Sequence, residues 1–202
     1  MGLKQSYTVL APMYDAIVSS ATAPMRRDSL RSLTTRERDR VLLAGVGTGL
    51  DIPYLPANAD YFAMDLTAAM LLRARQRLVP QHRIYLHRAN VMQMPYADNS
   101  FDSVVLHLIL AVVSEPHKVL AEASRVLKPG GRILILDKFL RPGQRAPVRR
   151  LINLLIRHIA TRTDVVFEDL LPHSPALQVI SDEACLAGGW FRRIQLQKTN
   201  GH

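Results

Sequence analysis

The sequence predicts an α/β fold with a doubly wound, mostly parallel sheet. Short apolar runs alternate along the chain with segments of helical periodicity, which is typical of parallel strands joined by helices. Two apolar runs near the end, at residues 177–184 and 190–197, are separated by so short a Gly188-Gly189 link that they must pair antiparallel. A length of 202 residues with 48% hydrophobic residues fits one such domain and excludes a disordered chain.

The expected elements follow in chain order. Strands are predicted over residues 40–44, 61–64, 83–87, 103–108 and 132–136, and helices directly after the first strand, over residues 67–78 and over residues 115–127. Thr67 is a suitable N-cap for the second helix, and Pro80 ends it. Lys128-Pro129-Gly130-Gly131 is expected to break the third helix and turn the chain into the fifth strand. The total is five parallel strands and a terminal hairpin.

The charge balance favours anionic partners. Lys and Arg number 26 against 17 Asp and Glu, which gives a formal net charge of +9. The apolar face of a predicted helix over residues 147–160 lies opposite Arg149, Arg150 and Arg157, as in a helix that rests on anionic lipid, although a helix packed on the sheet has the same pattern. Residues 11–33, with Arg26, Arg27 and Arg31, offer a second basic face.

Other partners and compartments are disfavoured. No apolar run approaches the roughly 20 residues of a membrane-spanning helix, and no secretory signal pattern is present, so a cytoplasmic location is expected, with peripheral membrane contact as an extension. Cys185 is the single cysteine, which excludes an intramolecular disulfide and a multi-cysteine metal site, and no metal is expected. An aromatic content of 6% and the lack of an Asn/Asp-Pro-Pro-Tyr/Phe motif argue against nucleic acid.

A nucleoside site is predicted at the end of the first strand. Gly45-Val46-Gly47-Thr48-Gly49 leaves room for a ligand against the backbone, and amides at the start of the next helix would face it. Asp65 follows Gly45 by 20 residues, at the tip of the neighbouring strand, where a carboxylate can accept both hydroxyls of a ribose. Leu50 stands where a dinucleotide fingerprint needs its third glycine, and no Gly-Lys-Ser/Thr triplet marks a phosphate loop.

Several further motifs accompany the glycine turn in order. They are Tyr14-Asp15, Met70-Leu71 after Asp65, Ser100-Phe101-Asp102, and Arg125-Val126-Leu127-Lys128-Pro129-Gly130-Gly131-Arg132. Together they resemble the class I S-adenosylmethionine-dependent methyltransferases, in particular the group of ubiquinone/menaquinone C-methyltransferases and bacterial phosphatidylethanolamine N-methyltransferases. The resemblance implies a Rossmann-like, seven-stranded sheet with an antiparallel C-terminal strand.

The resemblance also implies the cofactor and its site. S-adenosyl-L-methionine is expected to contact Gly45, Gly47, Thr48, Gly49, Asp65, Leu66, Asn90, Val91 and His107. His107 and Tyr14 are the catalytic candidates: His107 as a base for an acceptor that arrives protonated, or as a packed histidine, and Tyr14, with Tyr7, as part of a lid or as core packing. Two positions depart from the family pattern, because Leu43 stands where an acid is usual and Asn90 where an aspartate is usual.

The functional expectation is methyl transfer to a lipid amine, such as a phosphatidylethanolamine, or a similar amphiphile. The alternatives are a quinone or another soluble small molecule as acceptor, and a non-catalytic protein that only binds S-adenosylmethionine, which Leu43 favours. Residues 1–36 are expected to form a helical lid, residues 37–138 the cofactor-binding core, and residues 139–202 the acceptor-side helix and hairpin. Asp137 and Lys138 are expected near the acceptor or as a surface ion pair.

Overall fold

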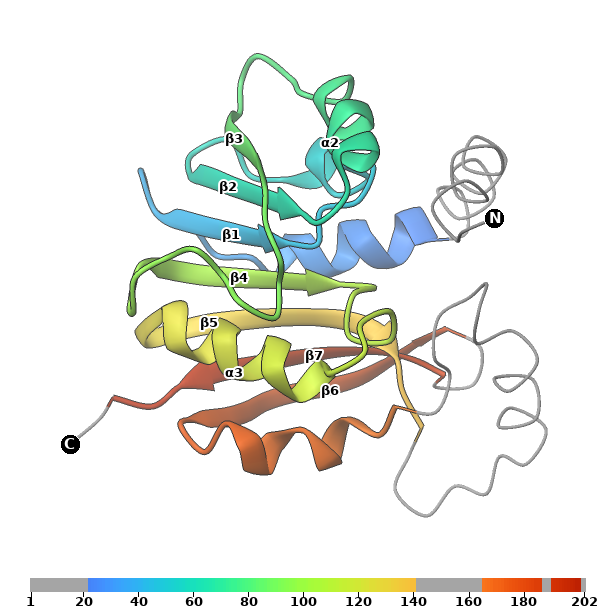
Figure 1. Ribbon diagram of the computed structural model, residues 1–202, viewed down its shortest axis with the longest axis vertical. Coiled ribbons are helices and arrows are strands. Elements are labelled where there is room, and N and C mark those ends of the chain that lie inside the picture. Colours follow the sequence, from blue (N-terminus) through green and yellow to red (C-terminus); the bar gives the residue numbers. More distant parts are fainter. Residues whose placement is uncertain (1–21, 141–164, 187–189, 201–202) are drawn as a thin grey trace.

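The computed structural model describes residues 22–140, 165–186 and 190–200 (Figure 1). The strands are β1 (Arg40–Ala44), β2 (Asp60–Asp65), β3 (Arg83–Arg88), β4 (Phe101–His107), β5 (Leu127–Lys138), β6 (Leu177–Leu186) and β7 (Phe191–Lys198). The α-helices are α2 (Ala68–Arg75), α3 (Pro116–Val126) and an unlabelled helix over residues 22–31. Three short 3-10 helices are η1 (Ile52–Tyr54), η2 (Phe167–Asp169) and η3 (Leu171–His173).

The strands form one seven-stranded sheet in the order β3-β2-β1-β4-β5-β7-β6 (Figure 1). The pairs among β1 to β5 are parallel, whereas β7 pairs antiparallel with both β5 and β6. The predicted fold class is therefore confirmed, including the antiparallel strand at the C-terminal end. Strand order reverses between β1 and β4, and in open α/β sheets the carboxyl ends at such a switch point are where ligands bind.

A buried apolar cluster lies on each face of the sheet. Alternation along β1 sends Leu42 into one cluster and Val41 and Leu43 into the other. The first cluster includes side chains of α3, which lies on the near face of the sheet in Figure 1. The second includes Leu30 of the helix over residues 22–31 and Ala74 of α2. Helices thus cover both faces, as a doubly wound sheet requires.

The prediction of a helix directly after the glycine turn is wrong. Only the three residues of η1 follow it, with a proline within its first two positions. Leu55 leaves η1 with an extended backbone, at φ −72° and ψ 142°, because the next residue, Pro56, disfavours helical geometry before it. The positive end of a long helix therefore does not contribute to this site, and the glycine turn itself must supply the backbone donors.

Several element boundaries also differ from expectation, and three of them change how the chain is divided. The helix α2 ends at Arg75 rather than Leu78, and β4 begins at Phe101, two residues early. The segment 128–131 does not separate α3 from β5 but belongs to the strand: Leu127 pairs with Phe101, and an irregularity precedes the next pair, Ser103 with Arg132. Glycine composition predicts a turn here, yet pairing with β4 holds the segment extended.

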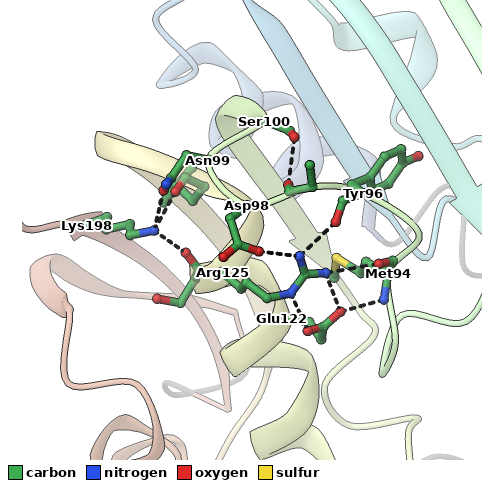
Figure 2. A network of polar contacts seen from close by, with 11 residues as sticks. Met94, Tyr96, Asp98, Asn99, Ser100, Glu122, Arg125 and Lys198 are labelled. Carbon is green, nitrogen blue, oxygen red and sulfur yellow. Dashed lines mark hydrogen bonds and ion pairs between the residues drawn. The ribbon is translucent and has the colours of Figure 1, made fainter.

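Arg125 of α3 anchors the loop between β3 and β4 (Figure 2). Its guanidinium forms ion pairs with Glu122 (2.8 Å) and Asp98 (2.7 Å) and donates to the carbonyl oxygens of Met94 and Tyr96. The Glu122 carboxylate also accepts from the Met94 amide at 2.6 Å. These contacts fix the loop that leads away from the carboxyl end of β3, so Arg125 has a structural role.

Lysines of two segments complete the same corner of the fold. Lys198 donates to Asn99 Oδ1 and to the carbonyl oxygens of Ser124 and Leu127, which joins the end of β7 to α3 (Figure 2). Lys128 forms an ion pair with Asp102 at 2.6 Å. Two motifs that carry the family resemblance, at 100–102 and 125–132, are therefore in direct contact through the Lys128–Asp102 pair.

Candidate cofactor and active site

The glycine turn at the carboxyl end of β1 is held against β2. The amides of Gly45 and Val46 both donate to the Met64 carbonyl oxygen at 2.9 Å. Gly45, Gly47 and Gly49 have φ values of +80°, +55° and +82°, in the left-handed region that favours glycine. Three such residues in five positions fold the chain back sharply at the tip of the strand.

The three glycines serve different purposes. A Cβ at Gly45 would lie 2.7 Å from the Ile109 side chain, and one at Gly49 would lie 2.9 Å from Ile52 and 3.0 Å from Ala74. These two glycines are required by packing. Among the described residues, no atom lies within 4 Å of where a Cβ at Gly47 would stand, so open space lies beside this residue. Gly47 is therefore the position where a ligand can approach the backbone.

Asp65, the last residue of β2, is bonded to the turn. Its Oδ2 accepts from the Gly47 amide at 3.0 Å, and its Oδ1 accepts from the Thr67 amide at 2.9 Å. Burial raises the pKa of the Asp65 carboxyl, against amide hydrogen bonds from Thr67, Gly47 and Leu66 that lower it. Each carboxylate oxygen keeps a further lone pair, so the group can still accept ribose hydroxyls.

The remaining predicted cofactor contacts lie around this turn and the end of β3. Thr48 is buried and its carbonyl oxygen accepts from Arg77 at 2.6 Å, whereas Leu66, next to Asp65, is 59% exposed. Asn90 follows β3, where its Oδ1 accepts from the Met92 amide at 3.0 Å, and Val91 beside it is buried. The side-chain oxygen of Asn90 therefore already accepts one hydrogen bond within its own turn.

His107, the last residue of β4, is enclosed by polar partners. Its Nδ1 lies 2.9 Å from Asp51 Oδ1, its Nε2 lies 3.0 Å from Ser29 Oγ, and its side chain is 1% exposed. Because a carboxylate only accepts, Nδ1 carries a proton, and Nε2 can accept the hydroxyl hydrogen of Ser29. Both ring nitrogens are therefore committed within the protein, which favours a positioning role for His107.

Asp51 joins His107 to the N-terminal helix. Its Oδ1 also accepts from Arg26 Nη1 at 2.9 Å, and the two side chains of this ion pair are 7% and 9% exposed. Burial alone would raise the pKa of the Asp51 carboxyl, but electrostatic attraction and hydrogen bonds from His107 and Arg26 outweigh it and hold that pKa well below its usual range. Asp51 is therefore a buried, ionised carboxylate that is bonded to both His107 and Arg26.

Asp137, near the end of β5, is fully buried. Its carboxylate accepts from the Ala111 amide at 3.0 Å and the Lys138 amide at 2.8 Å, and burial raises its pKa to about 6. The expectation of a surface ion pair is wrong for Asp137, because its carboxylate faces backbone amides inside the fold. It fixes the loop that follows β4, on the acceptor side expected from the sequence.

Arg26 does not belong to an exposed basic face. It is buried and paired, so the expectation that it contacts lipid is wrong, whereas Arg27 and Arg31 on the same helix are exposed. Tyr7, Tyr14 and the predicted helix over residues 147–160 lie outside the described residues. Within the described ranges, no helix is both long and apolar enough to cross a membrane, and no three metal-binding side chains converge.

Known proteins match most of this chain. Residues 42–135 fit the model of the methyltransferase domain family. The chain is 28% identical to a phosphatidylethanolamine N-methyltransferase of Cereibacter sphaeroides, over 92% of its own length and 93% of that protein. It is 34% identical to a demethylmenaquinone methyltransferase of Renibacterium salmoninarum, over 63% of this chain and 55% of that protein.

Residues 42–135 are therefore a methyltransferase domain. The fold of the whole chain agrees with a chain from the complex between the Haloferax volcanii Trm112 methyltransferase activator and a putative methyltransferase, at a TM-score of 0.78 and 15% identity over 100% of this chain and 99% of that one. The chain spans only about half the length of the Renibacterium relative, at 55% of that protein.

A solved structure with the same fold is a geranyl diphosphate methyltransferase in complex with S-adenosylmethionine, at 18% identity and a TM-score of 0.67 over 89% of this chain and 84% of that one. The residues present here fit S-adenosylmethionine: the open space beside Gly47 admits a ligand to the backbone, and Asp65 supplies a carboxylate for ribose hydroxyls. Leu43, which stands where the family usually has an acid, is 2% exposed and packs in the apolar cluster behind β1. The usual carboxylate at the tip of β1 is therefore absent.

Sequence reasoning missed Asp51, Arg26 and Ser29 as members of the site. Asp51 stands two residues after Gly49, so its closeness to the glycine turn was readable. Its burial and its pairing with a histidine 56 residues away were not, because they depend on how β4 and the N-terminal helix meet. A charged residue within a few positions of such a turn is the signal that could have drawn attention to it.

Proposed function

We propose that this protein transfers a methyl group from S-adenosylmethionine to a lipid amine such as a phosphatidylethanolamine, or to a similar amphiphile. The observation that carries the proposal is the extent of the match. The phosphatidylethanolamine N-methyltransferase of Cereibacter sphaeroides aligns over 93% of its length, whereas the demethylmenaquinone methyltransferase aligns over 55%. The parts outside the shared cofactor-binding core, where an acceptor would be selected, are thus matched by the lipid enzyme.

The bound cofactor supplies a methyl group activated by a sulfonium centre. The protein holds the reactants in line, which accelerates a direct displacement without covalent help from a side chain. Gly45, Gly47, Thr48 and Gly49 would offer the cofactor their backbone, and Asp65 would accept the ribose hydroxyls. Leu66, Asn90 and Val91 would lie around the adenine.

An amine acceptor that arrives as an ammonium must lose a proton before it can attack. His107 is poorly placed to take it, since both ring nitrogens are bonded within the protein. We therefore assign a positioning role to His107. The ammonium loses its proton to water, and the neutral amine is the nucleophile. The contact of Tyr14 with the acceptor remains a prediction. So does the assignment of residues 139–202 to the part of the protein that binds the acceptor.

The test is methyl transfer to defined acceptors. Vesicles of phosphatidylethanolamine with an anionic lipid, and separately a demethylated menaquinone, are incubated with labelled S-adenosylmethionine and analysed by mass spectrometry. The proposal expects one or more methyl groups on the lipid amine, and a much lower yield from the Asp65→Ala variant when S-adenosylmethionine is limiting. Methylation of the quinone alone would select the quinone alternative. Saturable cofactor binding without any product would select the non-catalytic alternative, which Leu43 favours.

We also propose peripheral contact with anionic membranes. The exposed Arg27 and Arg31 support it, together with the basic face predicted for residues 147–160. Each basic residue near such a surface contributes about 1 kcal/mol, which decays within a Debye length. Wild-type protein should float with anionic vesicles at low salt and detach as salt rises.

Charge-reversal variants locate this contact. Changing Arg149, Arg150 and Arg157 to Glu should abolish flotation and leave cofactor affinity unchanged. The matched control changes the exposed residues Arg36, Arg75 and Arg132 to Glu, an equal change in net charge, and should still float. Equal flotation of the first variant, or wild-type protein that ignores anionic vesicles, would contradict the membrane proposal.

A further inference from the structure

The buried ion pair of Arg26 and Asp51 has spare hydrogen-bonding capacity. Arg26 Nη1 donates to Asp51 Oδ1 at 2.9 Å, and the same Oδ1 accepts from His107 Nδ1. Within the described residues, no group hydrogen-bonds to the second carboxylate oxygen, Oδ2, or to the second terminal nitrogen, Nη2. One anionic oxygen and one cationic nitrogen of this pair therefore remain for another partner.

The pair lies at the edge of the cofactor site. Asp51 follows the glycine turn by two residues, and its partner His107 ends β4, the strand next to β1. The other carboxylates at this edge, of the half-buried Asp65 and the buried Asp137, already accept backbone amides: Asp65 from Gly47 and Thr67, and Asp137 from Ala111 and Lys138. With an apolar residue at position 43, Asp51 is the carboxylate left to serve a cationic group here.

The charge of the pair indicates what it can bind. Asp51 and Arg26 together are neutral, and both side chains are more than nine-tenths buried. A lone cation or a lone anion added beside them would leave an uncompensated charge in a poorly solvated place, which is costly. A zwitterion with adjacent ammonium and carboxylate groups adds one charge of each sign and leaves none uncompensated. The amino-acid end of S-adenosylmethionine is such a group.

We propose that Asp51 and Arg26 bind the amino-acid end of S-adenosylmethionine, with Asp51 accepting from its ammonium and Arg26 donating to its carboxylate. The pair thereby replaces the acid that is missing at Leu43. This inference rests on the proposed function, because it assumes that the cofactor occupies the glycine-turn site. It also explains why the N-terminal helix carries a buried arginine: the helix over residues 22–31 brings half of the subsite.

The surrounding residues hold the pair in place before a ligand arrives. His107 fixes the Asp51 carboxylate through Nδ1, and Ser29 Oγ fixes the imidazole through Nε2. Thr22 Oγ1 accepts from Arg26 Nε at 3.1 Å. Such support lowers the ordering cost of binding, because the side chains need not be immobilised by the ligand. Ser29, His107 and Thr22 are positioning residues in this arrangement.

The experiment compares two ligands by isothermal titration calorimetry. S-adenosylhomocysteine carries the amino-acid end, whereas 5′-methylthioadenosine keeps the adenosine and the sulfur but lacks it. The Asp51→Asn variant should bind S-adenosylhomocysteine at least about tenfold more weakly than wild type, as expected for a lost charged hydrogen bond. Its affinity for 5′-methylthioadenosine should stay within about twofold, because hydrogen bonds to the adenosine are untouched.

Two further variants make the test decisive. Asp65→Ala should weaken the binding of both ligands, because both contain the ribose. Arg26→Lys keeps the positive charge beside Asp51 but loses the second terminal nitrogen. It should therefore weaken the binding of S-adenosylhomocysteine but not of 5′-methylthioadenosine. This variant decides the question if Asp51→Asn does not fold.

The contradicting results are distinct. Wild-type affinity of Asp51→Asn for S-adenosylhomocysteine, or an equal loss for both ligands, would overturn this inference, the latter by showing that Asp51 only shapes the turn. Failure of the wild-type protein to bind either ligand would instead overturn the cofactor site and the proposed function with it.

Discussion

Substituting the glycines of the turn separates ligand binding from folding. Gly47→Ala places a methyl group where no atom in the described part of the chain lies within 4 Å, so its structural cost is confined to backbone strain at φ +55°. Strain of a non-glycine residue in this region is about 1–2 kcal/mol. For a domain of this size, each kcal/mol lowers the melting temperature by about 2–4 °C. The protein should therefore fold.

Cofactor affinity should respond much more strongly. The methyl group of Gly47→Ala, and still more the branched side chain of Gly47→Val, occupies the space through which a ligand reaches the turn. We expect Gly47→Ala to weaken S-adenosylhomocysteine binding at least about tenfold, equivalent to about 1.4 kcal/mol, and Gly47→Val to abolish it.

Gly45→Ala is the matched comparison. Its φ of +80° imposes similar strain, but its Cβ would also lie 2.7 Å from two atoms of the Ile109 side chain. Overpacking of this kind costs about 1–3 kcal/mol beyond the strain, so Gly45→Ala should be the less stable variant.

Thermal unfolding and calorimetric titration of the three variants check this. A folded Gly47→Val protein that binds S-adenosylhomocysteine as wild type does would refute the assignment of Gly47 to ligand approach. Equal destabilisation by Gly47→Ala and Gly45→Ala would refute the distinction drawn from packing.

Two predictions concern stability rather than binding. Arg125→Met removes ion pairs and carbonyl contacts of a side chain that is 32% exposed, so chemical denaturation should show a loss of about 1–3 kcal/mol, with cofactor affinity unchanged. The exposed Arg132→Met is its control and should change stability by less than about 0.5 kcal/mol. Asp137 has a folded pKa of about 6, above its unfolded value of about 3.9, so the native state binds the extra proton between these values. Stability from this group is therefore greatest below about pH 4 and falls by about 3 kcal/mol as pH rises through 6.

Comparison with Asp137→Asn isolates the second effect. The difference in free energy of unfolding between wild type and variant should shrink steadily from about pH 4 to pH 6.5. A difference that does not depend on pH would show that Asp137 titrates normally. For Arg125→Met, a loss of cofactor affinity that matches the loss of stability would show that the loop after β3 is part of the binding site.

The alternation of strands and helices, the terminal hairpin and the closeness of Asp65 to the glycine turn could be predicted from the sequence. Each depends on local information: periodicity, a glycine pattern and an acid at a strand tip. The helix expected after the turn failed for a local reason as well, since Pro53 and Pro56 both oppose it and were given too little weight.

The burial of charged residues could not be predicted in the same way. Arg26 has the sequence context of an exposed helix face, yet the fold brings it against Asp51, which is 25 residues away. Asp137 follows a buried strand in a manner typical of a surface position, yet the loop after β4 folds over it and supplies amide donors. Such partners are decided by tertiary packing, and no pattern within either segment contains them.

The proposed function depends on the claim that the glycine turn and Asp65 bind S-adenosylmethionine. The most direct measurement is calorimetric titration of wild type and Asp65→Ala with S-adenosylmethionine. Wild type should bind one equivalent per chain, and the variant should remain folded and bind about 1.5–3 kcal/mol more weakly, the value of hydrogen bonds to a charged acceptor. Unchanged affinity in a folded Asp65→Ala protein, or no binding by wild type, would contradict the claim.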